Sequence, residues 1–235
     1  MIKADRTPVP YVLLSILLAF SANAAAADTQ ANAGEGYYGS VKLLQTSQSV
    51  SNMENTSPRL IRVIDGPDTA HKTSGSLAVG YQFGNGWRTE AEYSLKRNVT
   101  FDSYWAPFDL NVNRFQVSSQ RLMLNVYRDF ALGNGFSAFA TLGLGLASVD
   151  AQGWQATKGR RFADRAQTNL TYSGGVGISY AVSRRINVDL GYRFVDMGNI
   201  ESGFNTFANN ASARDEQLKA NLKSSEVFLG MRMLF

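Results

Sequence analysis

The last twelve residues, Ser224–Phe235, read SSEVFLGMRMLF and show the clearest pattern in the chain. Apolar side chains stand at every second position of this stretch, and these are Val227, Leu229, Met231, Met233 and Phe235. Successive side chains of a β-strand point to opposite sides, so the alternation predicts a strand with one apolar face. The other face carries Glu226 and Arg232. The pattern alone does not say whether the apolar row meets a protein core or something outside the protein.

The same alternation recurs seven times earlier in the chain. It covers residues 37–43, 76–83, 87–96, 121–127, 138–147, 172–180 and 186–194. The connections alternate between turns of a few residues and long polar stretches. An even number of antiparallel strands with this alternation is typical of bacterial outer-membrane barrels. We therefore predict an all-β fold, an eight-stranded antiparallel transmembrane β-barrel with short periplasmic turns and long extracellular loops.

A soluble eight-stranded barrel or sandwich is the alternative, and it reverses the faces. It would bury every apolar row in one core and leave the polar rows to water. The glycines at 143, 145, 175 and 177 would then lie on the water face, where glycine weakens a strand without a packing gain. Glycines that face a narrow, filled interior are easier to explain, which favours apolar rows that face lipid.

The N-terminus has the three-part layout of a secretory signal. Lys3 and Arg6 precede an apolar run at residues 11–20, and small residues follow. This run is about half of the roughly 20 apolar residues that a membrane helix needs. We expect a signal peptide at residues 1–26, cleaved between 24 and 27, and a barrel domain at residues 27–235. The net charge of +4 gives no indication of nucleic-acid binding, and the absence of cysteine excludes disulfides.

The polar faces of the predicted strands place charges of both signs inside the barrel. The expected interior network consists of Lys42, Arg88, Glu90, Glu92, Lys96, Asp189, Arg193, Glu226 and Arg232. Buried charges are costly unless they are paired, so this near-balanced set indicates internal salt bridges. Eight strands enclose little more than the volume of their own side chains. A small gated ion path through the network is the alternative.

The third long connection, about residues 148–165, is a candidate ligand-binding loop. It carries one aromatic residue and four basic residues, which are Trp154, Lys158, Arg160, Arg161 and Arg165. Arginine forks at the outer leaflet suit lipopolysaccharide phosphates or an anionic host glycan. A solvated loop without a ligand explains the same composition equally well.

No catalytic, cofactor or metal site is expected. Glu90 and Glu92 share a face with Arg88, so mutual neutralisation explains them better than acid–base catalysis. His71 is the only histidine of the chain, and it stands near Asp68 in a polar connection. A hydrolase would need this histidine held against a nucleophile, and a metal site would need further ligands.

Short motifs along the chain resemble the opacity-protein-like family of eight-stranded outer-membrane barrels, also described as porin-like or surface-antigen proteins. The motifs are GYYG at 36–39, EYS at 92–94, LMLNVY at 122–127, LGYRF at 190–194 and EVFLGMR at 226–232. The resemblance covers the whole predicted mature chain. It implies a barrel in the outer membrane of a Gram-negative bacterium, with long loops that bind partners. It also implies that the barrel-assembly machinery reads the terminal strand, with Phe235 as the insertion signal.

These observations lead to a functional expectation. We expect an outer-membrane surface protein with a structural or interaction role, either adhesion to a host or anionic ligand or envelope integrity. The expected partners are outer-membrane lipid or lipopolysaccharide, the barrel-assembly machinery, and a host surface glycan or protein. A narrow porin-like channel for small solutes or ions is the first alternative, and a lipid-modifying barrel enzyme is the second.

Overall fold

The computed structural model describes residues 34–56, 62–64, 69–106, 108–209 and 212–235. The expected signal peptide lies outside these residues. The strands are β1 (Gly36–Asn55), β2 (Arg62–Ile64), β3 (Thr69–Gln82), β4 (Trp87–Ala106), β5 (Phe108–Gly133), β6 (Phe136–Gln155), β7 (Arg161–Ala181), β8 (Ile186–Glu201) and β9 (Leu218–Leu234). The described residues contain no helix long and apolar enough to cross a membrane.

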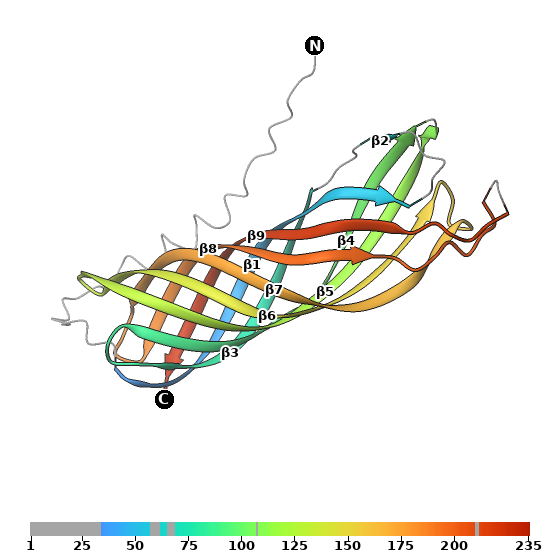
Figure 1. Cartoon of the computed structure of the whole chain (residues 1–235). Coiled ribbons are helices and arrows are strands. Elements are labelled where there is room, and N and C mark those ends of the chain that lie inside the picture. Colours follow the sequence, from blue (N-terminus) through green and yellow to red (C-terminus); the bar gives the residue numbers. More distant parts are fainter. Residues whose placement is uncertain (1–33, 57–61, 65–68, 107, 210–211) are drawn as a thin grey trace, which may run out of the picture.

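The long strands close into one antiparallel ring, as Figure 1 shows. Their order is β4-β3-β1-β9-β8-β7-β6-β5, and pairing of β4 with β5 completes the circle. The short strand β2 is attached to the outer end of β4, where Arg62 pairs with Ala106. The connections at 83–86, 134–135 and 182–185 are tight turns. The eight-stranded barrel predicted from the sequence is therefore confirmed.

The outer wall of the barrel carries a belt of exposed apolar side chains. Leu142 is 73% exposed, Leu124 is 68% exposed and Val79 is 66% exposed. Near the tight turns the belt ends in exposed aromatic rings, which are Tyr37, Phe83, Trp87, Phe130, Phe136 and Phe235. A continuous apolar band bounded by aromatic rings is the surface that a membrane barrel presents to lipid. The apolar rows therefore face outward, as the glycine argument predicted.

Three tyrosines mark the opposite edge of the belt. Each is exposed, and each hydroxyl bonds a polar side chain of the neighbouring strand. The bonds are Tyr93 to Gln120 at 3.0 Å, Tyr172 to Asp196 at 3.1 Å and Tyr192 to Ser225 at 3.0 Å. Tyrosine collects at the membrane–water interface because its ring is apolar and its hydroxyl is polar. We place the outer membrane boundary at this level.

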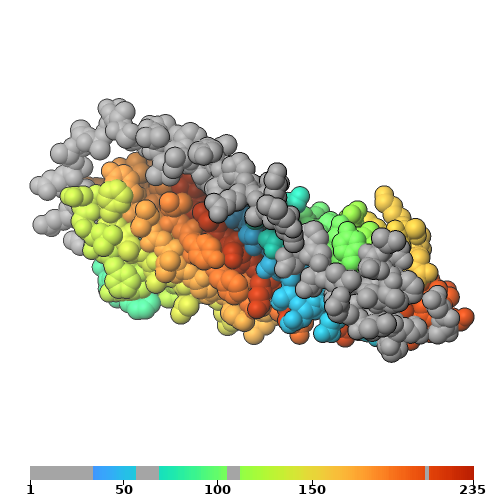
Figure 2. Space-filling model, turned by 90° about the horizontal axis from the view of Figure 1, so that it is seen from above, coloured from blue at the N-terminus to red at the C-terminus, as the bar shows by residue number. Residues whose placement is uncertain are grey.

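The strands continue well beyond this boundary, where long loops were expected. Residues 148–165 are mostly strand, and the β6–β7 connection is only the turn at 156–160. Figure 2 shows the resulting elongated body, with the β5–β6 turn at one end and the outer parts of β4, β6 and β7 at the other. The two-residue alternation persists in this region, but its polarity is reversed. Val99 and Phe101 point inward, whereas Asn98 and Thr100 face water.

Two different interiors follow from this reversal. The extracellular half is filled by one apolar cluster that includes Phe101, Phe115, Val149, Met197 and Leu218, all almost inaccessible. It packs as the core of a soluble protein does. The membrane half holds polar and charged side chains around a small cluster of Leu44, Tyr127, Phe139 and Phe228.

Glycine is required where the rings of the small cluster approach the wall. A Cβ atom at Gly177 would lie 2.3 Å from Cζ of Phe139 and 2.4 Å from the carbonyl oxygen of Leu190. At Gly191 a Cβ atom would lie 2.5 Å from Cζ of Phe228. Both glycines therefore make room for aromatic rings inside a narrow barrel.

Candidate functional site

The interior network begins near the tight turns with two arginines on one aspartate. Arg88 lies 3.3 Å from Asp189 and 2.9 Å from Asp129, and Arg232 lies 3.5 Å from Asp189. The Arg88 guanidinium also stacks over the ring of Tyr127, 4.1 Å from its centroid. The four elements β4, β5, β8 and β9 supply these groups, so the contacts cross the barrel and tie its walls together.

The next layer outward contains a lysine, an arginine and two glutamates. Lys42 is paired with Glu90 and lies 2.8 Å from Glu92. Arg193 donates two hydrogen bonds of 2.8 Å to Glu92. A forked arginine on a carboxylate is among the strongest polar contacts in proteins. The layer is balanced in charge and almost fully buried, which fits a structural plug.

Glu226 forms the outermost layer and is the centre of three arginine contacts. It lies 2.9 Å from Arg97, 2.8 Å from Arg121 and 2.9 Å from Arg193. The Glu226 side chain is 0% exposed, and Ser224 donates a further hydrogen bond of 3.1 Å. Arginines from three different strands therefore share one buried carboxylate.

Lys96 does not belong to this network, which corrects one sequence prediction. Its side chain is 54% exposed on the outer wall, where it lies 2.9 Å from Asp150. The register of β4 against β5 shifts between Ser94 and Arg97 because β4 contains one extra residue there. After this bulge, the side chains that strict alternation would place inside point outward, and the others point inward. Arg97 takes the inward position in its place.

Two further arginines, Arg97 and Arg121, lie in the interior and are absent from the predicted network. Arg121 shares the inward face of β5 with Asn125 and Tyr127, so the alternation of that strand was a sufficient signal. Arg97 could not be found in this way, because the bulge that turns it inward has no mark in the sequence. The other expected members, from Lys42 to Arg232, all lie buried inside the barrel.

Three residues of the candidate ligand loop, Trp154, Arg161 and Arg165, lie on strands at the extracellular end, and the other two lie in the turn at 156–160. Backbone pairing sets four outward residues side by side across the wall, in the order Asp102, Arg114, Trp154 and Arg161. Arg114 lies 5.7 Å from the centroid of the Trp154 ring. Two hydrogen bonds of 2.7 and 2.8 Å join it to Asp102, and this carboxylate raises the pKa of Arg114. Trp154 thus lies between Arg114 and Arg161 in the strand register.

The remaining basic residues of that region have different surroundings. The Arg160 guanidinium stacks 4.0 Å from the centroid of Phe207 and donates a bond of 2.8 Å to Gln155. Arg165 lies 2.9 Å from Glu201. Both arginines therefore hold neighbouring segments of the protein. Lys158 is exposed in the turn at 156–160.

His71 and Phe235 are the remaining residues singled out from the sequence. His71 is exposed on β3, whereas Asp68 lies outside the described residues. No group of three or more possible metal ligands occurs in the part of the chain that the structure describes. Phe235 is 81% exposed, and its backbone N–H donates to the carbonyl of Tyr37 at 3.0 Å. Its role as an insertion signal stays a prediction.

A closed barrel with an apolar outer belt, aromatic edges and a filled interior defines an integral outer-membrane protein. Comparison with known families agrees. Residues 12–222 match the family described as outer membrane protein beta-barrel domain, and the chain belongs to this family. The protein is located in the outer membrane of a Gram-negative bacterium.

Individual relatives are distant. The outer membrane protein PagN of Salmonella typhimurium is 25% identical over 175 residues, which cover 68% of this chain and 72% of PagN. A Rickettsia canadensis protein named as a candidate adhesin is 28% identical over 138 residues, which cover 55% of this chain and 61% of that protein. The crystal structure of OprG from Pseudomonas aeruginosa superposes with a TM-score of 0.57 at 13% identity, covering 85% of this chain and 97% of OprG. The likeness to OprG shows the fold alone.

Proposed function

We propose that this protein is a non-enzymatic surface adhesin whose extracellular end binds an anionic glycan. The observation that carries the proposal is the row in which Arg114 and Arg161 flank Trp154, with Lys158 exposed at the adjoining turn. The fork of Arg114 already holds Asp102, so Lys158 and Arg161 supply the cations for sulfate or carboxylate groups. The aromatic face of Trp154 packs on the apolar side of a sugar ring.

The strands beneath this surface support the proposal. Arg114, Trp154 and Arg161 stand on β5, β6 and β7, whose outer ends are paired and backed by the apolar cluster. A binding group on rigid strands loses little conformational freedom when the ligand binds. The name of the Rickettsia canadensis relative points to the same kind of role.

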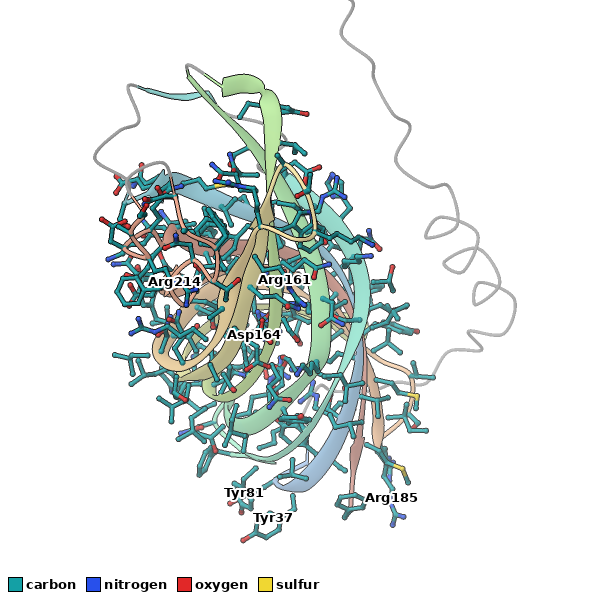
Figure 3. The ribbon with its side chains drawn as sticks, turned by 90° about the vertical axis from the view of Figure 1, so that its right-hand side faces the viewer. Tyr37, Tyr81, Arg161, Asp164, Arg185 and Arg214 are labelled. Carbon is teal, nitrogen blue, oxygen red and sulfur yellow. The ribbon has the colours of Figure 1, made fainter. Side chains whose placement is uncertain are left out.

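The test uses two charge-matched double variants. Lys158→Gln with Arg161→Gln removes two positive charges from the proposed surface, whereas Arg184→Gln with Arg185→Gln removes two from a turn at the other end. Figure 3 shows how far Arg185 lies from Arg161. The refolded proteins are applied to an immobilised sulfated polysaccharide and eluted with salt, because electrostatic binding weakens as salt screens it.

The proposal predicts that only the first double variant elutes at lower salt. Equal elution of both variants and the unchanged protein would refute it. Arg160 and Arg165 are left unchanged, because their contacts with Phe207 and Glu201 make any loss of binding ambiguous.

We also propose that the barrel is closed to ions, in preference to a porin-like channel. Any path along its axis would cross the buried charge layers and then the apolar cluster of the extracellular half. An open path would require the buried charged side chains and the apolar cluster to move together. The role of the membrane half is then to anchor the binding end.

A further inference from the structure

A trough lies on the outer wall of the extracellular half, below the row of Arg114, Trp154 and Arg161. It crosses β4, β5, β6 and β7 and has a volume of about 580 Å³. Figure 3 shows Asp164, one of its lining residues, on the same strand as Arg161. Because the trough opens sideways, it faces whatever stands beside the barrel and not what approaches from above.

The trough is lined by groups that bind hydroxylated molecules. Its lining includes Asn98, Gln116 and Gln152, which carry side-chain amides, and Thr100, which carries a hydroxyl. At one edge Lys96 is paired with Asp150 at 2.9 Å, and at the other Arg165 is paired with Glu201 at 2.9 Å. Each cation has a carboxylate partner, so the lining is close to neutral.

Several of these polar groups have unused hydrogen-bonding capacity. Among the described residues, none forms a side-chain hydrogen bond with Asn98 or Gln116. Gln152 accepts one bond of 3.2 Å from Arg161, which leaves its amide donors. A side-chain amide offers two donors and an acceptor. Such a set fits the hydroxyl groups of a saccharide better than a compact, multiply charged phosphate.

The height of the trough above the membrane decides what fills it. Leu122, which is 57% exposed, lies at the edge of the apolar belt on β5, and Gln120, Ser118 and Gln116 follow at alternate positions. With a rise of ~3.4 Å per residue and a tilt of ~40°, each step adds about 5 Å of height. Gln116 therefore stands about 15 Å above the edge of the hydrocarbon, by the same geometry.

We propose that this trough binds the saccharide head group of a glycolipid from the outer leaflet of the protein's own membrane. The trough lies above the apolar belt on the same wall of the barrel, so a lipid whose chains pack on the belt places its head group at the level of the trough. A soluble macromolecule meets the extracellular end of the barrel first. This inference does not depend on the proposed adhesion, because the trough faces sideways and the two surfaces share only the hydrogen bond from Arg161 to Gln152.

The test compares two uncharged triple variants in detergent. Asn98→Ala, Gln116→Ala and Gln152→Ala empties the trough of amides, whereas Gln45→Ala, Ser47→Ala and Ser49→Ala changes outward polar residues of β1. Calorimetric titration uses two probes, which are intact lipopolysaccharide and its core oligosaccharide released from the acyl chains. Native migration on gels without heating verifies that each variant is folded.

The trough variant should bind the oligosaccharide at least about tenfold more weakly, because three hydrogen-bonding groups are lost. The β1 variant should bind as the unchanged protein does. Equal affinity of all three proteins for the oligosaccharide would overturn the inference. The inference would also be overturned if all three proteins bound intact lipopolysaccharide equally and none bound the oligosaccharide. Binding of the acyl chains to the apolar belt would then explain the result. Loss of adhesion in the Lys158 and Arg161 variant should leave oligosaccharide binding intact.

Discussion

Replacement of Glu226 by glutamine should strongly destabilise the barrel. The substitution keeps the size of the side chain but removes the charge that Arg97, Arg121 and Arg193 share at 2.8 to 2.9 Å. These guanidinium groups are buried and cannot turn to water. Loss of one partner from a buried ion pair costs about 3–5 kcal/mol, and here one carboxylate serves three cations, so we expect a loss at the upper end of that range.

Glu201 provides a matched control. It also bridges two cations, Arg165 at 2.9 Å and Lys219 at 3.2 Å, but its side chain is 27% exposed. Exposed ion pairs contribute about 0–1 kcal/mol, so Glu201→Gln should be nearly neutral. Urea unfolding of protein in lipid vesicles, followed by tryptophan fluorescence, gives both free energies. Adding Arg121→Met to Glu226→Gln should restore part of the loss, because it removes one uncompensated cation. Equal losses at Glu226 and Glu201 would refute the reasoning, since they would mean that water screens the interior charges.

Three further predictions concern the filling of the barrel. In planar bilayers the protein should produce no stable unitary current steps, and regular steps would show that the interior opens. Phe115→Ala should lower the free energy of unfolding by about 3–5 kcal/mol through lost core packing. Hydrogen exchange should accelerate in the outer ends of β4 to β6 but not near the tight turns. Uniform acceleration would contradict a separate extracellular core. Gly177→Val should prevent native folding because of the 2.3 Å approach to Phe139, whereas Gly159→Val in the open outer turn should fold normally; normal folding of both would show that the ring can move.

The membrane half could be predicted from the sequence because each strand there has one apolar face. The alternation from Val227 to Phe235 recurs in each of the other long strands, and the glycines on the polar faces favour lipid outside with polar side chains inside. The outer half could not be predicted in the same way. Val99 and Phe101 keep the two-residue period, but in the opposite sense, so the region was interpreted as polar loop.

Individual site residues depended on features that the sequence does not show. Lys96 was placed inside because strict alternation was assumed, and the bulge before Arg97 breaks that assumption. Trp154 and Arg161 were found together because they are near each other in the chain. Arg114 was missed because strand pairing alone brings it beside Trp154. The contact of Arg160 with Phe207 depends likewise on how residues 202–209 fold back, which composition does not reveal.

The outward orientation of the apolar rows can be measured with single labelled cysteines, because the chain has no cysteine of its own. Nitroxide labels at Leu124→Cys, Asn125→Cys and Gln116→Cys probe the belt, the interior and the extracellular wall. In lipid vesicles the label at 124 should collide with oxygen dissolved in the hydrocarbon, and the label at 116 should collide with a water-soluble nickel reagent. The label at 125 should be shielded from both. A label at 124 that meets the nickel reagent as readily as the label at 116 would contradict the outward apolar belt.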